Sequence, residues 1–204
     1  SSIVEQIKKE NPEFDITRIN YKDPKVYNLF AEGRTEGIFQ FESSGMKEKL
    51  RLLKPTEFND IVAMNALYRP GPMAQIETYI RRKHGEEKVN YPHPNLEKIL
   101  KDTYGVIVYQ EQIMLIAVNF AHMSLNEADN MRRAVSKKKK EDLEYYGRIF
   151  IEKSVAAGYD RNVAKSLFDL IVTFANYGFN KSHAVVYSML AYRLAYLKVY
   201  YTKY

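Results

Sequence analysis

The side chains that could carry chemistry in this sequence are basic, and they gather in three clusters. The first, at residues 131–140, reads MRRAVSKKKK and holds six basic residues and no acidic one. The second is RRKH at residues 81–84, and the third is NKSH at residues 180–183. The chain also has 17 tyrosines, whose rings can stack on bases while cations meet phosphates. The clusters therefore suggest nucleic acid, although each one could also be a solvated surface.

Two turns could present such cations to an anion. One is the segment YRPGP, which places Arg69 on a turn made rigid by proline, although the same prolines could simply end a helix. The other, at Gly178, opens a helix that Ser182 could cap. Backbone N–H groups at a helix start bind phosphate well, and Lys181 would add charge and His183 a donor. An ordinary link between two helices would have the same pattern.

Arg132 and Arg133 form a further candidate, because they are adjacent on a predicted helix. Adjacent helical residues point about 100° apart, so we expect only one of the two to face a given ligand squarely. Four lysines at residues 137–140 end the same predicted helix. Cations at a helix C-terminus complement the helix dipole, so this run also has a purely structural explanation.

A complete catalytic set is missing from the sequence. The chain has no cysteine, no Asp-x-Asp pair of the kind that two-metal phosphoryl transfer uses, and no Walker A, GxGxxG or GxSxG motif. Its four histidines form neither HxxxH nor HExxH, which argues against a zinc hydrolase. A Ser-His-Asp triad stays open, since its members need no fixed spacing. We predict that this chain contains no catalytic residue and no metal site, and that it supplies charge and shape.

Helical periodicity dominates the elements that must position these residues. Helix starts are predicted at Asp23, at Ser43 or Ser44, and at Ser124, and glycines or prolines end the helices. Only residues 37–41 and 105–109 indicate brief extended pieces. Tyr109 and Gln110, which close the second piece and begin the next helix, could simply be a cap and a first helical turn. The expected fold class is mainly α, with a mixed segment at residues 1–36.

Composition and hydropathy restrict the class of protein. The 204 residues are 46% hydrophobic and 27% charged, with a net charge of +6, which is typical of a folded globular chain. No apolar run reaches the roughly 18 residues that cross a bilayer, and the N-terminus lacks a signal-peptide pattern. We expect a cytoplasmic protein with no membrane partner. Because the composition does not change before the last residue, we also expect a fragment of a longer polypeptide.

Six segments stand in order along the chain. They are GIFQFESSGM (37–46), ALYRPGPM (66–73), YIRRKHG (79–85), TYGVIVYQEQIM (103–114), ADNMRRAVSKKK (128–139) and YGFNKSHAVVYSMLAYRLAYLK (177–198). Together they resemble the alpha subunit of bacterial DNA polymerase III, the C-family replicative polymerase, in its DnaE type. The resemblance covers about residues 22–200. It implies a helical fingers domain at residues 37–204, preceded at 1–36 by a small mixed piece from the end of the palm.

The resemblance implies that the whole subunit is a DNA-directed DNA polymerase, a nucleotidyltransferase that extends a primer and releases pyrophosphate. In the family, the catalytic aspartates and their two Mg²⁺ ions lie in the palm, outside this chain. We therefore expect this chain to be inactive alone and to hold no cofactor by itself. The implied partners are primer–template DNA, deoxynucleoside triphosphates, the remaining polymerase domains and, through regions outside this chain, replisome subunits such as the sliding clamp.

The resemblance also assigns site residues by motif position. The triphosphate ligands would be Arg132 and Arg133, and the residues lining the nucleotide pocket would be Arg69, Lys83, Asn180, Lys181 and His183. The residues expected to contact DNA are Tyr109, Gln110, Lys137, Lys138, Lys139 and Lys140, with the lysines on the phosphate backbone. Which of the two arginines contacts the triphosphate stays open.

Two other functions remain as alternatives. A non-catalytic helical nucleic-acid-binding module would account for the basic clusters and the tyrosines, but not for the order of the six segments. It should bind DNA and ignore nucleoside triphosphates. A protein–protein scaffold would need a large exposed apolar face and should ignore both ligands at moderate salt.

Overall fold

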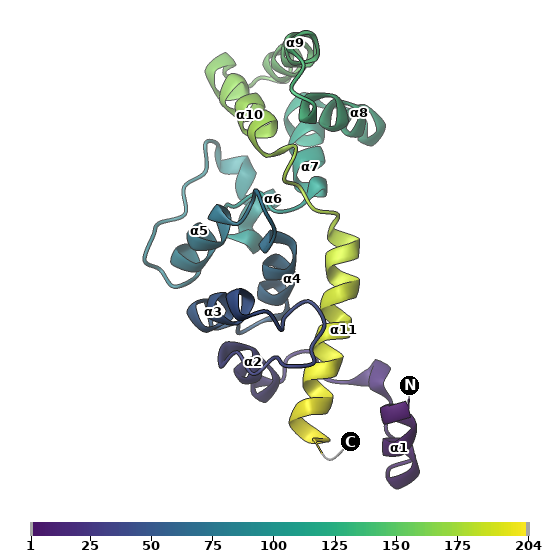
Figure 1. Ribbon diagram of the computed structural model, residues 1–204. Coiled ribbons are helices and arrows are strands. Elements are labelled where there is room, and N and C mark those ends of the chain that lie inside the picture. Colours follow the sequence, from purple (N-terminus) through teal and green to yellow (C-terminus); the bar gives the residue numbers. More distant parts are fainter. Residues whose placement is uncertain (1, 203–204) are drawn as a thin grey trace. The chain divides into compact units, whose positions relative to one another are not determined.

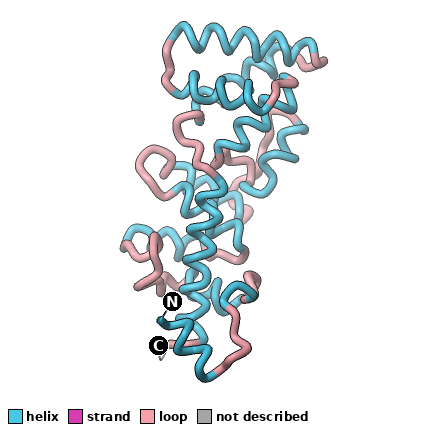
Figure 2. Tube along the Cα trace, turned by 90° about the vertical axis from the view of Figure 1, so that its right-hand side faces the viewer, coloured by secondary structure: helices cyan, strands magenta, loops and turns pink. Residues whose placement is uncertain are grey.

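The computed structural model describes residues 2–202, which are predominantly helical (Figure 1; Figure 2). Within these residues there are eleven α-helices and three short 3-10 helices, and the β interaction is an isolated parallel bridge between Tyr109 and Phe179. The mainly α fold class is therefore confirmed. The chain divides into two compact units, one of Ser1–Tyr68 with Ser182–Tyr204 and the other of Arg69–Lys181. The predicted boundary between residues 36 and 37 stays a prediction.

Side-chain caps begin several helices of the first unit. Asp23 accepts a hydrogen bond from the backbone N–H of Lys25, directly before Pro24 at the first helical position. Ser43 accepts one from the N–H of Met46. These starts agree with the predicted ones. The helices that contribute to this unit are α1 (Ser2–Glu10), η1 (Ile16–Arg18), α2 (Pro24–Ala31), α3 (Ser44–Leu53), α4 (Phe58–Leu67) and α11 (Lys181–Tyr200).

Helix α11 supplies much of the core of the first unit. Five of its six buried residues recur with helical spacing, namely Ala184, Ser188, Ala191, Tyr192 and Ala195, and the sixth is Leu197. The Tyr192 hydroxyl donates to the carbonyl of Asn20 at 2.5 Å and accepts from the N–H of Asp23 at 3.1 Å. These bonds hold the segment before α2 against α11. Of the helices described, none has the length and apolar character needed to cross a membrane.

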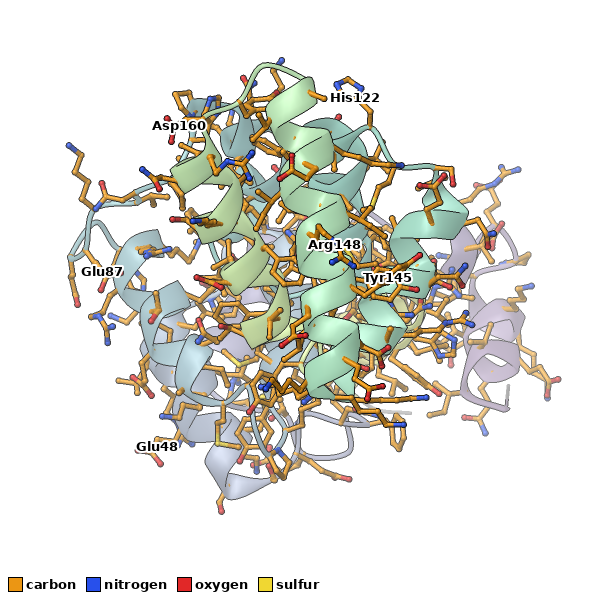
Figure 3. All side chains as sticks on the ribbon, turned by 90° about the horizontal axis from the view of Figure 1, so that it is seen from above. Glu48, Glu87, His122, Tyr145, Arg148 and Asp160 are labelled. Carbon is orange, nitrogen blue, oxygen red and sulfur yellow. The ribbon has the colours of Figure 1, made fainter. Side chains whose placement is uncertain are left out.

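The second unit is built around a group of four helices. Helix α10 packs against α9, and α7 packs against α8 and α9 (Figure 1). Their shared core contains Phe120, Met131 and Phe150, all fully buried. Tyr145 and Arg148 lie on the exposed face of α9 (Figure 3). The elements of this unit are α5 (Ala74–Lys83), η2 (Pro94–Leu96), α6 (Glu97–Leu100), η3 (Lys101–Thr103), α7 (Gln110–Ala121), α8 (Leu125–Ser136), α9 (Lys140–Ala156) and α10 (Arg161–Phe174).

The extended piece expected at residues 37–41 is wrong, because this segment forms turns. Gly37 and Gln40 have φ angles of +77° and +74°, which a strand does not allow. The Thr35 hydroxyl donates to the carbonyl of Phe41, and the Phe41 ring packs 5.5 Å from that of Phe30. Ile38 and Phe41 are therefore buried as single side chains and not through strand pairing, while Phe39 is exposed.

Candidate functional site

The two adjacent arginines of α8 share one carboxylate. Arg132 donates from Nη2 and Nε to Oδ1 of Asp129, at 2.7 and 3.3 Å. Arg133 Nη2 lies 2.7 Å from Oδ2 of the same side chain. Both arginines thus reach one carboxylate of their own helix, and the expectation that only one of them would face a given ligand squarely stays a prediction. Residues three and four positions after Asp129 lie on its face of the helix, and long side chains point back toward the N-terminus.

The three side chains of this arginine–aspartate cluster differ in exposure. Arg132 is 13% exposed and Asp129 is 22% exposed, whereas Arg133 is 68% exposed. Helix α8 is anchored by Ala128 and Met131, which are fully buried. The cluster therefore sits at the edge of the buried stripe, with one arginine partly enclosed and the other in solvent.

A short backbone link joins the segment at Gly178 to the start of α7. The N–H of Phe179 donates to the carbonyl of Val108 at 3.0 Å, and the N–H of Gln110 donates to the carbonyl of Phe179 at 2.9 Å. A Cβ on Gly178 would lie 3.2 Å from backbone atoms of Gln110, so glycine allows this close approach. The backbone of Gln110 thus has a structural role, and contact of its side chain with DNA stays a prediction.

Lys181 lies at the start of α11 beside residues of α7. Its ammonium nitrogen is 5.4 Å from the centre of the Tyr109 ring, a cation–π distance. Its backbone N–H donates to both carboxylate oxygens of Glu111, at 3.1 and 3.3 Å. Glu111 therefore places a negative charge where a phosphate was expected, and Ser182 is not the cap because α11 begins before it. Tyr109 is 4% exposed, so its ring is packed beneath the ammonium group.

Arg69 contacts the segment that precedes α11. Its Nη2 donates to the carbonyl of Tyr177, and its guanidinium carbon lies 5.1 Å from the centre of the Phe179 ring. Burial lowers the pKa of Arg69. Gly71 has a φ of +102°, and a Cβ there would meet the Tyr177 ring at 2.7 Å. The YRPGP turn and residues 177–179 are therefore packed together, with Arg69 joining them.

Two arginines of the RRKH cluster make contacts within the fold. Arg82 Nε lies 2.7 Å from the carboxylate of Glu87, and its Nη1 donates to the carbonyl of Tyr104 at 2.9 Å. Arg81 contacts the same carboxylate at 3.3 Å. These contacts fix the start of the loop after α5, which Glu87 marks in Figure 3. Lys83, the residue assigned to the nucleotide pocket, is the last residue of α5.

The four consecutive lysines form the turn between α8 and α9. Helix α8 ends at Ser136, Lys138 has a left-handed φ of +54°, and α9 begins at Lys140. All four side chains are exposed. The prediction that the run ends one helix is therefore wrong. Favourable interaction with the C-terminus of α8 can explain only the first lysines of the run. Lys140 lies at the N-terminus of α9, where a cation is disfavoured.

Two of the assigned residues flank Lys181. Asn180 is exposed directly before α11. His183 is exposed in the first turn of that helix and belongs to the first unit. Contacts within the second unit bring together two groups of these site residues, Arg132 with Arg133 at Asp129, and Arg69 with Lys181 through residues 177–179.

Sequence reasoning missed two acids, Asp129 and Glu111. The spacing of Asp129 three and four residues before the arginines could have identified it, since such pairs meet on a helix. Glu111 contacts a residue 70 positions away, so no local pattern marks it. In the described part of the chain, no group of three or more acidic or histidine side chains is arranged to hold a metal ion.

Comparison of the sequence with known proteins identifies the family of this chain. The family model for the bacterial DNA polymerase III alpha subunit finger domain matches residues 1–158, so the chain belongs to that family. The chain is 56% identical to the DNA polymerase III subunit alpha of Bacillus subtilis (strain 168) over 197 residues. This match covers 97% of this chain and 18% of that protein. The DNA polymerase III subunit alpha of Halalkalibacterium halodurans is 57% identical over 187 residues, which is 92% of this chain and 17% of that protein. The DNA polymerase III subunit alpha of Staphylococcus epidermidis is 53% identical over 203 residues, which is 99% of this chain and 19% of that protein. The chain spans about a fifth of the length of these curated relatives.

Proposed function

We propose that this finger domain binds the triphosphate of an incoming deoxynucleotide, together with the template DNA beside it. The observation that carries the proposal is the convergence of Arg132 and Arg133 on one anionic group. Phosphoryl transfer depends on positioning and on neutralising the charge of the phosphates, and arginine pairs do both. The place now taken by a carboxylate oxygen has the chemistry that a phosphate oxygen requires.

A second group of residues supports phosphate or sugar binding near α11. Lys181 brings a cation, held over the Tyr109 ring, to a helix N-terminus. Asn180 and His183 flank it in sequence with further polar groups. In this proposal Arg69 acts on the nucleotide indirectly, by holding the backbone at Tyr177 that leads to Lys181.

The lysine turn is proposed to contact the DNA backbone. Four exposed cations on one turn suit phosphates, whose neutralisation releases counterions and favours binding. Lys137, Lys138, Lys139 and Lys140 would contribute affinity without reading sequence, because phosphate contacts carry no base information.

The reaction itself is proposed for the longer protein. The relatives are named as DNA polymerase III alpha subunits, and a nucleotidyltransferase needs metal-binding acids that the described residues do not group together. We propose that the remaining domains supply the catalytic aspartates and Mg²⁺, and that this chain alone does not extend a primer. Primer–template DNA, deoxynucleoside triphosphates, other polymerase domains and replisome subunits such as the sliding clamp are the proposed partners, in the cytoplasm.

A nuclear magnetic resonance titration tests the nucleotide site. Adding a deoxynucleoside triphosphate with Mg²⁺ should produce saturable shifts at Arg132, Arg133 and Lys181. Arg133→Ala should raise the Kd at least about tenfold, because a charged hydrogen bond contributes about 1.5–3 kcal/mol. Arg148→Ala, which removes an exposed arginine from α9, is the matched control and should leave the Kd unchanged.

The same titration separates the alternative function. The exposed lysine turn also favours a non-catalytic nucleic-acid-binding module, which would respond to DNA and ignore the triphosphate. Saturable shifts with DNA, combined with none from the nucleotide, would contradict triphosphate binding and favour that module.

A further inference from the structure

We propose that Asp129 is a built-in counter-anion of the arginine pair, and that its charge limits how much more tightly the pair binds highly charged phosphates than weakly charged ones. The inference rests on the proposed function of Arg132 and Arg133. An incoming phosphate would take Arg133 from Asp129, while Arg132 remains bound to the carboxylate. Asp129 would then be a specificity-determining residue and not only a structural ion-pair partner.

The two ion pairs of Asp129 differ in strength. Arg132 donates two hydrogen bonds to one carboxylate oxygen and is 13% exposed. Arg133 makes one 2.7 Å contact to the other oxygen and is 68% exposed. Ion pairs of exposed side chains contribute little, about 0–1 kcal/mol, because water screens them and the long side chains lose entropy. Arg133 is therefore the arginine that can exchange Asp129 for a ligand.

The carboxylate also opposes the binding of anionic ligands, and more so the greater their negative charge. Two guanidinium groups and one carboxylate leave the cluster one net positive charge instead of two. A ligand that brings about the same charge as Asp129 gains little by replacing it. A polyphosphate carries several negative charges, so the two arginines attract it more strongly than phosphate and Asp129 also repels it more strongly. Repulsion of the wrong ligand is a common source of specificity.

Removing this charge should change selectivity. We expect Asp129→Asn in the 204-residue chain to lower the Kd for inorganic phosphate by about three- to tenfold, the effect of one nearby unit charge in a partly screened site. The affinity for inorganic tripolyphosphate should rise more, because the repulsion by one unit charge grows with the charge of the ligand, so the ratio of tripolyphosphate affinity to phosphate affinity rises. Adding Arg133→Ala to Asp129→Asn should abolish the gain.

Two further variants serve as controls. Glu127→Gln removes the same charge from the same helix, where Glu127 pairs with Lys153 at 2.9 Å, and it should leave the ratio unchanged. Asp129→Glu keeps the charge and should keep the wild-type ratio. Circular dichroism and thermal unfolding establish that each variant is folded. If Asp129→Asn does not fold, the test rests on Asp129→Glu. A ratio of phosphate and tripolyphosphate affinities that differs from wild type in Asp129→Glu overturns the proposal.

Isothermal titration calorimetry with the two inorganic probes separates the outcomes. A lower phosphate Kd in Asp129→Asn, lost on adding Arg133→Ala, supports the role of Asp129. Unchanged or weaker phosphate binding in folded Asp129→Asn overturns it. A wild-type chain that ignores tripolyphosphate contradicts the proposed function. If the wild type ignores tripolyphosphate but Asp129→Asn binds it, the role of Asp129 as a counter-anion is still supported. If neither protein binds tripolyphosphate, the counter-anion proposal is overturned as well.

Discussion

At the scale of single residues, carboxylates accompany the cations at both candidate phosphate positions. Asp129 bridges Arg132 and Arg133, and Glu111 accepts the backbone N–H of Lys181. Each acid occupies the place in which a basic cluster alone would predict a phosphate. The positive charge available to a ligand is therefore smaller than a count of the basic residues indicates, and the acids belong to the description of the site.

The role of Glu111 can be tested through stability. Glu111→Gln replaces the carboxylate that meets the start of α11 with a neutral amide. We expect the free energy of unfolding to fall by about 0.5–1 kcal/mol, since an anion at a helix N-terminus stabilises it by about that amount. Urea denaturation measures the change. Glu144→Gln, an exposed acid within α9, is the control and should change it by less than about 0.5 kcal/mol. Equal losses in the two variants would refute the capping role.

At the scale of elements, side-chain contacts hold the irregular segment between α2 and α3. Phe41 packs against Phe30, and Thr35 bonds to the carbonyl of Phe41. Glu36 binds Lys47 of α3 at 2.7 Å and Lys198 of α11 at 3.3 Å. One exposed acid thus links this segment to two helices of the first unit.

The acid dependence of stability should report on Glu36. The hydrogen bond from Lys47, followed by a backbone hydrogen bond and one from Lys198, lowers the pKa of Glu36 from its usual 4.5 to about 2. Because the pKa is lower in the folded state, ionised Glu36 stabilises the fold above about pH 4.5, and this contribution is lost as the pH falls toward 2. Thermal unfolding should show Glu36→Gln less stable than the wild type at about pH 7, with a difference that shrinks at about pH 2.5.

The difference between the two proteins should be small, since Glu36 is exposed and water screens its ion pairs. Glu48→Gln, at an exposed position of α3, is the matched control and should not reproduce the pattern. A difference between wild type and Glu36→Gln that is constant over the whole pH range would mean that the charge of Glu36 is unimportant.

At the scale of the whole molecule, the chain passes between its two units twice, after Tyr68 and after Lys181. Within the second unit these two points are connected. Arg69, its first residue, binds the carbonyl of Tyr177, and Phe179 pairs with the backbone of residues 108–110. Arg69, which is assigned to the nucleotide pocket, therefore also helps to close the second unit, so its substitution should affect folding as well as binding.

Electrostatics of the whole chain should determine its affinity for DNA. Replacing the lysine turn by glutamines should flatten the dependence of log K on log salt by up to about 0.9 for each duplex phosphate contact that is lost. Fluorescence anisotropy with a labelled primer–template at several salt concentrations measures this slope. The control removes four exposed lysines elsewhere and is Lys88→Gln, Lys98→Gln, Lys101→Gln and Lys165→Gln together. If both sets flatten the slope equally, net charge and not the turn determines binding.

Much of the helical fold could be predicted from the sequence because its signals are local. Asp23, Ser43 and Ser124 each accept a backbone hydrogen bond from a residue two or three positions later, as predicted for helix starts. The extended piece at residues 37–41 was wrong because Ile38 and Phe41 enter the core singly, from turns, while Phe39 stays exposed. Propensity cannot distinguish that arrangement from a strand, since both bury the same residue types.

The candidate site likewise has features that local sequence determines and features that only tertiary contacts determine. The sequence by itself determined the helical class, the family resemblance and the basic residues, all of which depend on residue type and short spacing. Only the tertiary structure decided what those cations contact: Glu111 at Lys181 across 70 positions, and Tyr177 at Arg69 across 108. A local pattern constrains residues within a turn or two of helix, whereas contacts over such separations exist only after packing has brought distant helices and turns together.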